Sequence, residues 1–150
     1  MQAQNEFIVI FKDKYTTLTY YEKLTLAICQ VDAEYIPIND FKKTFEFISK
    51  FIETSKIFYF VFDKSNLRTF HQPSMEWYFA IWKPSLRAKG LVNHYKILPN
   101  LEWFAKAVEA GKHEILQKYG KDILSGINIT YISSINEVIE QIEMNNKYVL

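Results

Sequence analysis

Glycine, proline and cysteine are all scarce in this sequence. Its 150 residues include 4 glycines and 4 prolines, scattered along the chain rather than gathered in one stretch. A phosphate-binding loop needs clustered glycines so that backbone amides can approach the anion, so none is predicted. No linker, low-complexity tract or internal repeat divides the chain, and we therefore expect a single domain over residues 1–150.

Disulfide and metal chemistry have little basis in the sequence. Cys29 is the only cysteine, which excludes an internal disulfide. The three histidines, His71, His94 and His113, are far apart and lack the spacing of a zinc site. There is also no Gly-x-Ser-x-Gly motif for nucleophilic catalysis. We therefore expect no metal, no cofactor, no catalytic residues and no enzyme activity.

Neither sign of charge dominates. The chain has 18 basic and 17 acidic residues, a formal net charge of +1, whereas nucleic-acid-binding domains usually carry a strong basic excess. No apolar run approaches the roughly 20 residues of a membrane helix, and residues 1–6 lack the features of a signal peptide. We therefore expect a cytoplasmic protein with no nucleic-acid partner and no membrane insertion.

Strand and helix patterns predict an α/β domain. Residues 7–11, 16–20 and 24–31 are short β-rich runs that should pair antiparallel. Helices and strands then alternate, which implies parallel strands and right-handed crossovers. The expected fold is a mixed β-sheet with antiparallel N-terminal strands, parallel strands from βα repeats, and about four helices packed on it.

The predicted helices have recognisable ends. The first is capped by Asn39 or Asp40 and runs to about residue 55. The second starts near Pro73 and is kinked or divided at Pro84. The third is capped by Asn100 and pauses at Gly111. The last follows a capping box at residues 134–137. The strands between them are residues 57–62, 92–98 and 127–132.

The segment from Asp63 to Trp77 carries the clearest candidate site. It leaves the carboxyl end of a predicted buried strand, where α/β proteins tend to place binding sites. A partner surface or phosphorylation site there would use Asp63, Ser65, Arg68, Ser74, Glu76 and Trp77. The alternative is structural: Asp63 closes a turn, Ser74 helps to start a helix, and Trp77 packs in the core.

A predicted strand is followed by Asp63-Lys-Ser-Asn-Leu67, by a helix with Glu76-Trp77, and by Gly90. In these residues, which lie within about 58–90, and in element order, the sequence resembles the SpoIIAA-like branch of the STAS (sulfate transporter and anti-sigma factor antagonist) family. The resemblance implies a mixed sheet and a non-catalytic protein that binds a kinase-like partner. It also implies a phosphoacceptor serine after the central strand. Ser74 occupies that place, within Gln-Pro-Ser-Met where the family has Asp-Ser-Ser-Gly.

Two functions remain open at this point. The first is a regulatory or protein-interaction module of STAS type, acting as a monomer or a homodimer. The second is a carrier or sensor of a small apolar ligand such as a lipid. Aromatic residues make up 17% of the chain, and they either fill the core or line a pocket. The candidate pocket residues are Tyr78, Trp82, Trp103 and Phe104.

Overall fold

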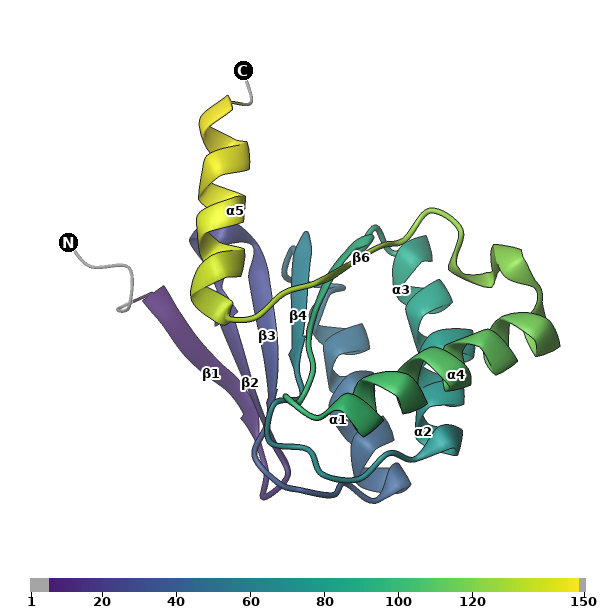
Figure 1. Cartoon of the computed structure of the whole chain (residues 1–150). Helices are drawn as coiled ribbons and strands as arrows, with labels where there is room; N and C mark the ends of the chain where they lie inside the picture. Colours follow the sequence, from purple (N-terminus) through teal and green to yellow (C-terminus); the bar gives the residue numbers. More distant parts are fainter. Residues whose placement is uncertain (1–5, 149–150) are drawn as a thin grey trace.

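A six-stranded mixed sheet forms the centre of the computed structural model, which describes residues 6–148 (Figure 1). The strands lie across the sheet in chain order, β1 to β6. β1, β2 and β3 pair antiparallel, and β3, β4, β5 and β6 pair parallel. The bounds are β1 Phe7–Lys12, β2 Thr16–Tyr21, β3 Leu26–Val31, β4 Tyr59–Asp63, β5 Asn93–Ile97 and β6 Asn128–Tyr131.

Helices cover both faces of this sheet. One face carries α1 to α4 and the other carries α5 (Figure 1). The bounds are η2 Glu22–Leu24, α1 Ile38–Phe51, α2 Gln72–Trp77, η3 Tyr78–Trp82, α3 Lys83–Ala88, α4 Glu102–Tyr119, η4 Lys121–Leu124 and α5 Ile135–Tyr148. The predicted α/β fold, with antiparallel strands first and parallel strands after them, is confirmed. No helix within residues 6–148 has the length and apolar character needed to cross a membrane.

Two of the predicted helix caps are wrong. α1 starts before Asn39 and Asp40, with Pro37 at its N-cap, and α4 starts after Asn100, with Leu101 at its N-cap. Neither N-cap residue makes a side-chain capping hydrogen bond. Most helical stability in proteins comes from packing of the apolar face, so packing can set a helix start where a capping residue does not.

The second predicted helix is divided, as its proline suggested, but the irregular turn precedes Pro84. α2 passes into the π-helical turn η3 and then into α3, which has Pro84 in its first turn. Proline is tolerated there because the missing N–H lies near a helix start.

α4 runs without a pause through Gly111, contrary to the prediction. This glycine serves a close approach between helices rather than a break. A side chain at this position would collide with Gln72 and press on Phe70 and Met75. Gln72 also donates a hydrogen bond to the Gly111 carbonyl at 3.3 Å. The absence of a side chain therefore lets α4 pack against α2.

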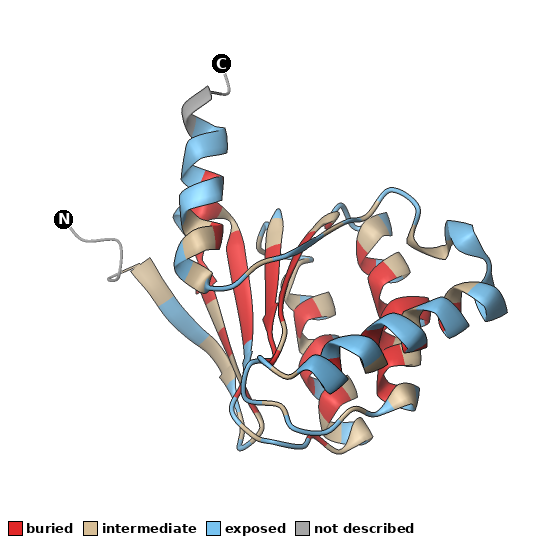
Figure 2. Cartoon of the chain, viewed as in Figure 1, coloured by how far each residue is buried: buried red, intermediate tan, exposed pale blue. Residues whose placement is uncertain are grey.

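The aromatic residues of the chain lie mainly in the core between the sheet and α1, η3 and α4. The ring of Phe45 lies with its centroid 4.8 Å from Trp82, 5.0 Å from Phe62 and 5.1 Å from Tyr78. These rings are buried, as the concentration of red in the central strands and facing helices shows (Figure 2). A smaller core on the other face packs Val138 and Ile142 of α5 against the sheet.

Replacing Trp82 with phenylalanine is expected to lower the free energy of unfolding by about 1–2 kcal/mol, because it removes a buried hydrogen bond and leaves a small void. The Trp82 indole N–H donates to the Phe45 carbonyl at 2.8 Å. Urea denaturation checks this, with Trp103→Phe as the matched control at a half-exposed tryptophan. Equal losses in the two variants would contradict it.

Candidate functional site

A narrow pocket lies at the carboxyl end of β4, between the following loop, α2, η3 and the start of α4. It has about 60 Å³ of free space. Its walls are mostly apolar and include Phe62, Leu67, Phe70, Met75, Phe79 and Phe104. Concave apolar sites with a few convergent polar groups are the usual form of small-molecule sites, and this pocket has that form.

Lys64 supplies the positive charge of the pocket. Its side chain is buried, and its Nζ lies 5.2 Å from the ring centroid of Phe62 and 5.8 Å from that of Phe104. Within the described residues, 6–148, no carboxylate lies within salt-bridge distance of this amine. Because burial disfavours the charged form, the pKa of Lys64 is lowered to about 8.

Five further residues with polar side chains line the same pocket: Tyr35, Thr69, His71, Ser74 and Tyr78. The His71 ring is the N-cap of α2, and its Nδ1 accepts a hydrogen bond from the Ser74 backbone N–H at 3.3 Å. The Ser74 hydroxyl also lies 2.9 Å from Nδ1. Tyr78 is 2% exposed, and its hydroxyl has no hydrogen-bond partner in the part of the chain that the structure describes.

Two more lysines lie behind the inner wall of the pocket. Lys96 Nζ is 3.9 Å from the ring centroid of Phe79, and Lys83 Nζ is 4.8 Å from that of Tyr78. Both side chains are fully buried. Lys83 Nζ lies 2.9 Å from His94 Nδ1, whereas Lys96 Nζ has no hydrogen-bond partner among residues 6–148.

Burial disfavours the charged forms of these three groups. Burial, and then the neighbouring lysines, lower the pKa of Lys83 and Lys96 well below the ordinary lysine value. Burial and the nearby Lys83 amine lower the pKa of His94 to about 2. His94 Nε2 faces the Leu91 carbonyl at 3.4 Å, so Nε2 donates and Nδ1 accepts from Lys83. The site therefore combines one lysine in the pocket with two buried amines beneath it, of which Lys83 is hydrogen-bonded to His94 and Lys96 has no hydrogen-bond partner among residues 6–148.

The polar residues proposed for the segment from Asp63 to Trp77 have structural contacts. Asp63 Oδ1 accepts hydrogen bonds from the backbone and hydroxyl of Ser65 at 3.0 and 2.7 Å, which closes a turn. Arg68 donates to the Ser65 carbonyl at 2.8 Å. Trp77 is half-buried and packs its ring edge-on against Phe41, with centroids 6.1 Å apart. These contacts give each of these residues a role in the fold.

Glu76 and Ser74 are also engaged within the molecule. Glu76 Oε2 accepts hydrogen bonds from Lys118 Nζ at 2.8 Å and from the Tyr119 hydroxyl at 2.6 Å, which ties α2 to the end of α4. Ser74 is buried at 7% exposure, with its hydroxyl against His71. A kinase could reach this hydroxyl only if the first turn of α2 opened.

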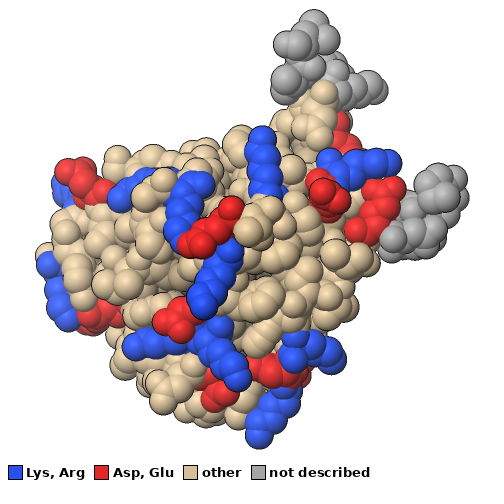
Figure 3. All heavy atoms as spheres, turned by 180° about the vertical axis from the view of Figure 1, so that it is seen from behind, with Lys and Arg blue, Asp and Glu red and all other residues tan. Residues whose placement is uncertain are grey.

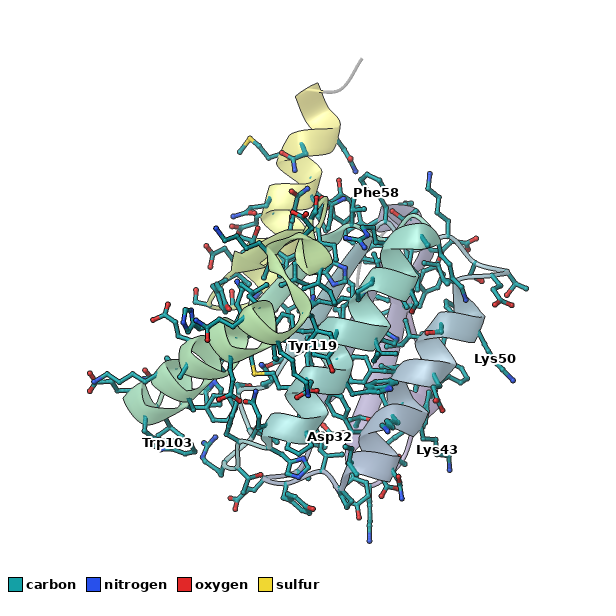
Figure 4. The ribbon with its side chains drawn as sticks, turned by 90° about the vertical axis from the view of Figure 1, so that its right-hand side faces the viewer. Asp32, Lys43, Lys50, Phe58, Trp103 and Tyr119 are labelled. Atoms are coloured by element: carbon teal, nitrogen blue, oxygen red, sulfur yellow. The ribbon has the colours of Figure 1, made fainter. Side chains whose placement is uncertain are left out.

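The four aromatic residues predicted to share a pocket do not all meet. Tyr78 and Phe104 line the pocket. Trp82 lies deeper in the core, bonded to α1. Trp103 is half-exposed at the start of α4 and points away from the other helices (Figure 4). The structure thus brings together Ser74 from one predicted set and Tyr78 and Phe104 from the other.

Sequence reasoning missed Lys64, Lys83 and Lys96. One signal was present in the strand 92–98, where His94 and Lys96 alternate with Tyr95 and Ile97. In a strand buried on both faces, two polar residues at a spacing of two must point to the same side. That pattern predicts a polar cluster inside the core.

Other parts of the surface are less suited to a ligand. A larger hollow of about 320 Å³ between α4 and β6 is lined mostly by exposed residues, including Glu102, Lys106 and Glu109. The face seen in Figure 3 carries acidic and basic side chains interspersed, without a field of one sign. No group of residues in the described range has the composition to hold a metal ion.

Comparison with family models, with curated proteins and with solved structures finds no match to this chain. What characterises the chain is its fold class, an α/β domain with a mixed sheet. Its candidate site is the lysine-bearing apolar pocket at the end of β4. The resemblance to the SpoIIAA-like proteins stays a prediction.

Proposed function

We propose that the chain is a non-catalytic binding module for a small molecule that has an apolar body and one acidic group. The observation that carries this proposal is the buried amine of Lys64 in an apolar pocket, with no carboxylate of the described residues to pair it. A buried charge without a partner is costly, and a ligand carboxylate would offset that cost. The apolar walls would take the rest of the ligand.

The size of the pocket restricts the ligand further. One water molecule needs about 10–15 Å³ of free space on this measure. The free space of about 60 Å³ therefore suits a group of a few non-hydrogen atoms. A short-chain organic acid fits this description, and the tail of a longer acid would extend through the mouth of the pocket.

A role in binding another protein would use the loop between β4 and α2, which also forms part of the pocket wall. Leu67 and Phe70 form part of the pocket wall, while Ser65 and Arg68 between β4 and α2 are exposed. Ligand contact with the wall would alter the surface that this loop offers to another protein. In this proposal the conformation of the loop depends on whether a ligand occupies the pocket. Ser74 is not required as a phosphoacceptor.

Butyrate is expected to bind the wild-type protein at pH 7 more tightly than butyramide, its neutral counterpart. A charge-assisted hydrogen bond contributes about 1.5–3 kcal/mol, so Lys64→Met should weaken butyrate binding roughly tenfold or more. Calorimetric titration checks this, with Lys43→Met as the control because Lys43 is exposed on α1 (Figure 4).

Affinity should also fall as the pH rises through about 8, because the lowered pKa of Lys64 removes its charge there. Equal binding of butyrate and butyramide, or equal affinity in wild type and Lys64→Met, would contradict the proposal.

A further inference from the structure

We propose that Lys64 captures small apolar aldehydes and ketones as a covalent imine. The inference rests on the proposed function, since it uses the same pocket and the same class of apolar ligand body. It is carried by the position of the amine: Lys64 lines a pocket whose remaining walls are largely apolar, and its Nζ lies 5.2 Å from the ring centroid of Phe62 and 5.8 Å from that of Phe104.

Two conditions for imine formation are met at this position. The first is free amine, because the nucleophile is the neutral form of lysine. With a pKa of about 8, Lys64 holds roughly two orders of magnitude more neutral amine at pH 7 than an ordinary lysine does. The second is an apolar lining, which leaves a bound imine few contacts with water and so slows its hydrolysis.

The other buried amines are less suited to this reaction. Lys83 Nζ is hydrogen-bonded to His94, and Lys96 Nζ lies against the ring of Phe79. Neither of these lysines lines the pocket. Among the three buried lysines, Lys64 is thus the one that a ligand in the pocket can meet.

The reaction balances without an oxidant or reductant. The nitrogen lone pair of Lys64 attacks the carbonyl carbon, and the carbonyl π electrons move to oxygen. That oxygen takes up a proton and nitrogen loses one, which gives a carbinolamine. The C–O bond then breaks as nitrogen forms the C=N bond, and the second amine proton leaves with the oxygen as water.

Proton transfer has candidate groups in the pocket. Tyr78 and His71 both line it. A phenol and an imidazole are groups of the type that pass a proton to a leaving carbinolamine oxygen.

The test uses butanal as the probe, with sodium cyanoborohydride to reduce the imine to a stable butyl-lysine. Peptide mass mapping at short times then gives the labelling rate of each lysine. Lys106 is the internal reference, because its side chain is 76% exposed in α4. We expect Lys64 to be labelled at least tenfold faster than Lys106 at pH 7, although it is the more buried lysine.

The pH dependence of the labelling rate distinguishes an amine with a lowered pKa from one that is only exposed. The Lys64 rate should level off above about pH 8, where its amine is already neutral, while the Lys106 rate should keep rising toward pH 10. Labelling of Lys64 no faster than Lys106, or parallel pH profiles, would overturn the inference.

Lys64→Arg distinguishes this inference from the proposed function. Arginine keeps the positive charge for butyrate but forms no imine under these conditions. The variant should therefore still bind butyrate and should lose the early label at position 64. Wild-type protein that binds butyrate but is not labelled early at Lys64 would overturn the capture inference alone. Wild-type protein that is labelled early but does not prefer butyrate to butyramide would contradict the proposed function instead.

Discussion

Replacing Lys96 with methionine is expected to stabilise the protein at pH 7 by about 1–3 kcal/mol, the cost of burying a polar group without a hydrogen bond. Lys96 is 1% exposed, pairs in the sheet with Phe62 of β4, and places its Nζ on the ring of Phe79. Its amine has no hydrogen-bond partner in the described part of the chain. Methionine keeps an unbranched side chain that can pack against Phe79, and it removes the amine.

Urea denaturation measures this change. Lys43→Met serves as the control, because Lys43 is exposed on α1 and its replacement should alter stability by less than about 0.5 kcal/mol. A loss of stability in Lys96→Met would contradict the account, since it would mean that the amine makes a favourable interaction in the folded protein.

Raising the pH from 7 to 9 is expected to increase the free energy of unfolding, by about 1 kcal/mol from Lys64 alone. The pKa of Lys64 is about 8 in the folded protein, against 10.5 as its ordinary value. Between these two values the unfolded chain binds a proton that the folded chain does not. Stability therefore rises with pH across this window.

Lys83 and Lys96 should add to this rise, because the folded protein holds their pKa values well below that of ordinary lysine. Groups with a raised pKa act in the opposite direction, above all Cys29 and Tyr78. Burial raises the pKa of Cys29 and of Tyr78 well above their ordinary values, so ionisation in the unfolded chain lowers stability above about pH 9–10. We therefore expect stability to rise up to pH 9 and to level off above it.

Denaturation at pH 6, 7, 8 and 9 checks this dependence. Lys96→Met should show a shallower rise than wild type, because one of the contributing amines is gone. Lys43→Met should follow the wild-type curve. Stability that stays constant or falls between pH 7 and 9 would mean that the buried lysines keep their protons in the folded protein.

The sheet could be predicted because it depends on patterns that lie within the sequence. Short β-rich runs, followed by helix and strand in alternation, fix an antiparallel part and a parallel part. The helix starts at Asn39 and Asn100 were predicted wrongly because capping residues are common in loops as well as at helix ends. Gly111 was misread for a similar reason: its role depends on α2, which is distant in sequence.

The candidate site was predicted only in part. The segment after β4 was correctly expected to lie at the carboxyl end of a buried strand, and it does supply much of the pocket wall. The lysines were overlooked because lysine is almost always exposed, and no local feature distinguishes Lys64 or Lys83. Their burial results from the packing of η3 and α4 over the sheet, a long-range arrangement that no single segment encodes.

The most direct test of the account is the titration of Lys64 itself. In protein labelled with ¹³C-lysine, the NMR signal of the carbon bonded to Nζ reports the charge of each amine, and Lys64→Arg identifies the Lys64 signal. We predict a midpoint near pH 8 for the free protein, and a higher midpoint with butyrate because a bound carboxylate favours the charged amine. A Lys64 midpoint at the ordinary lysine value, unchanged by butyrate, would contradict it.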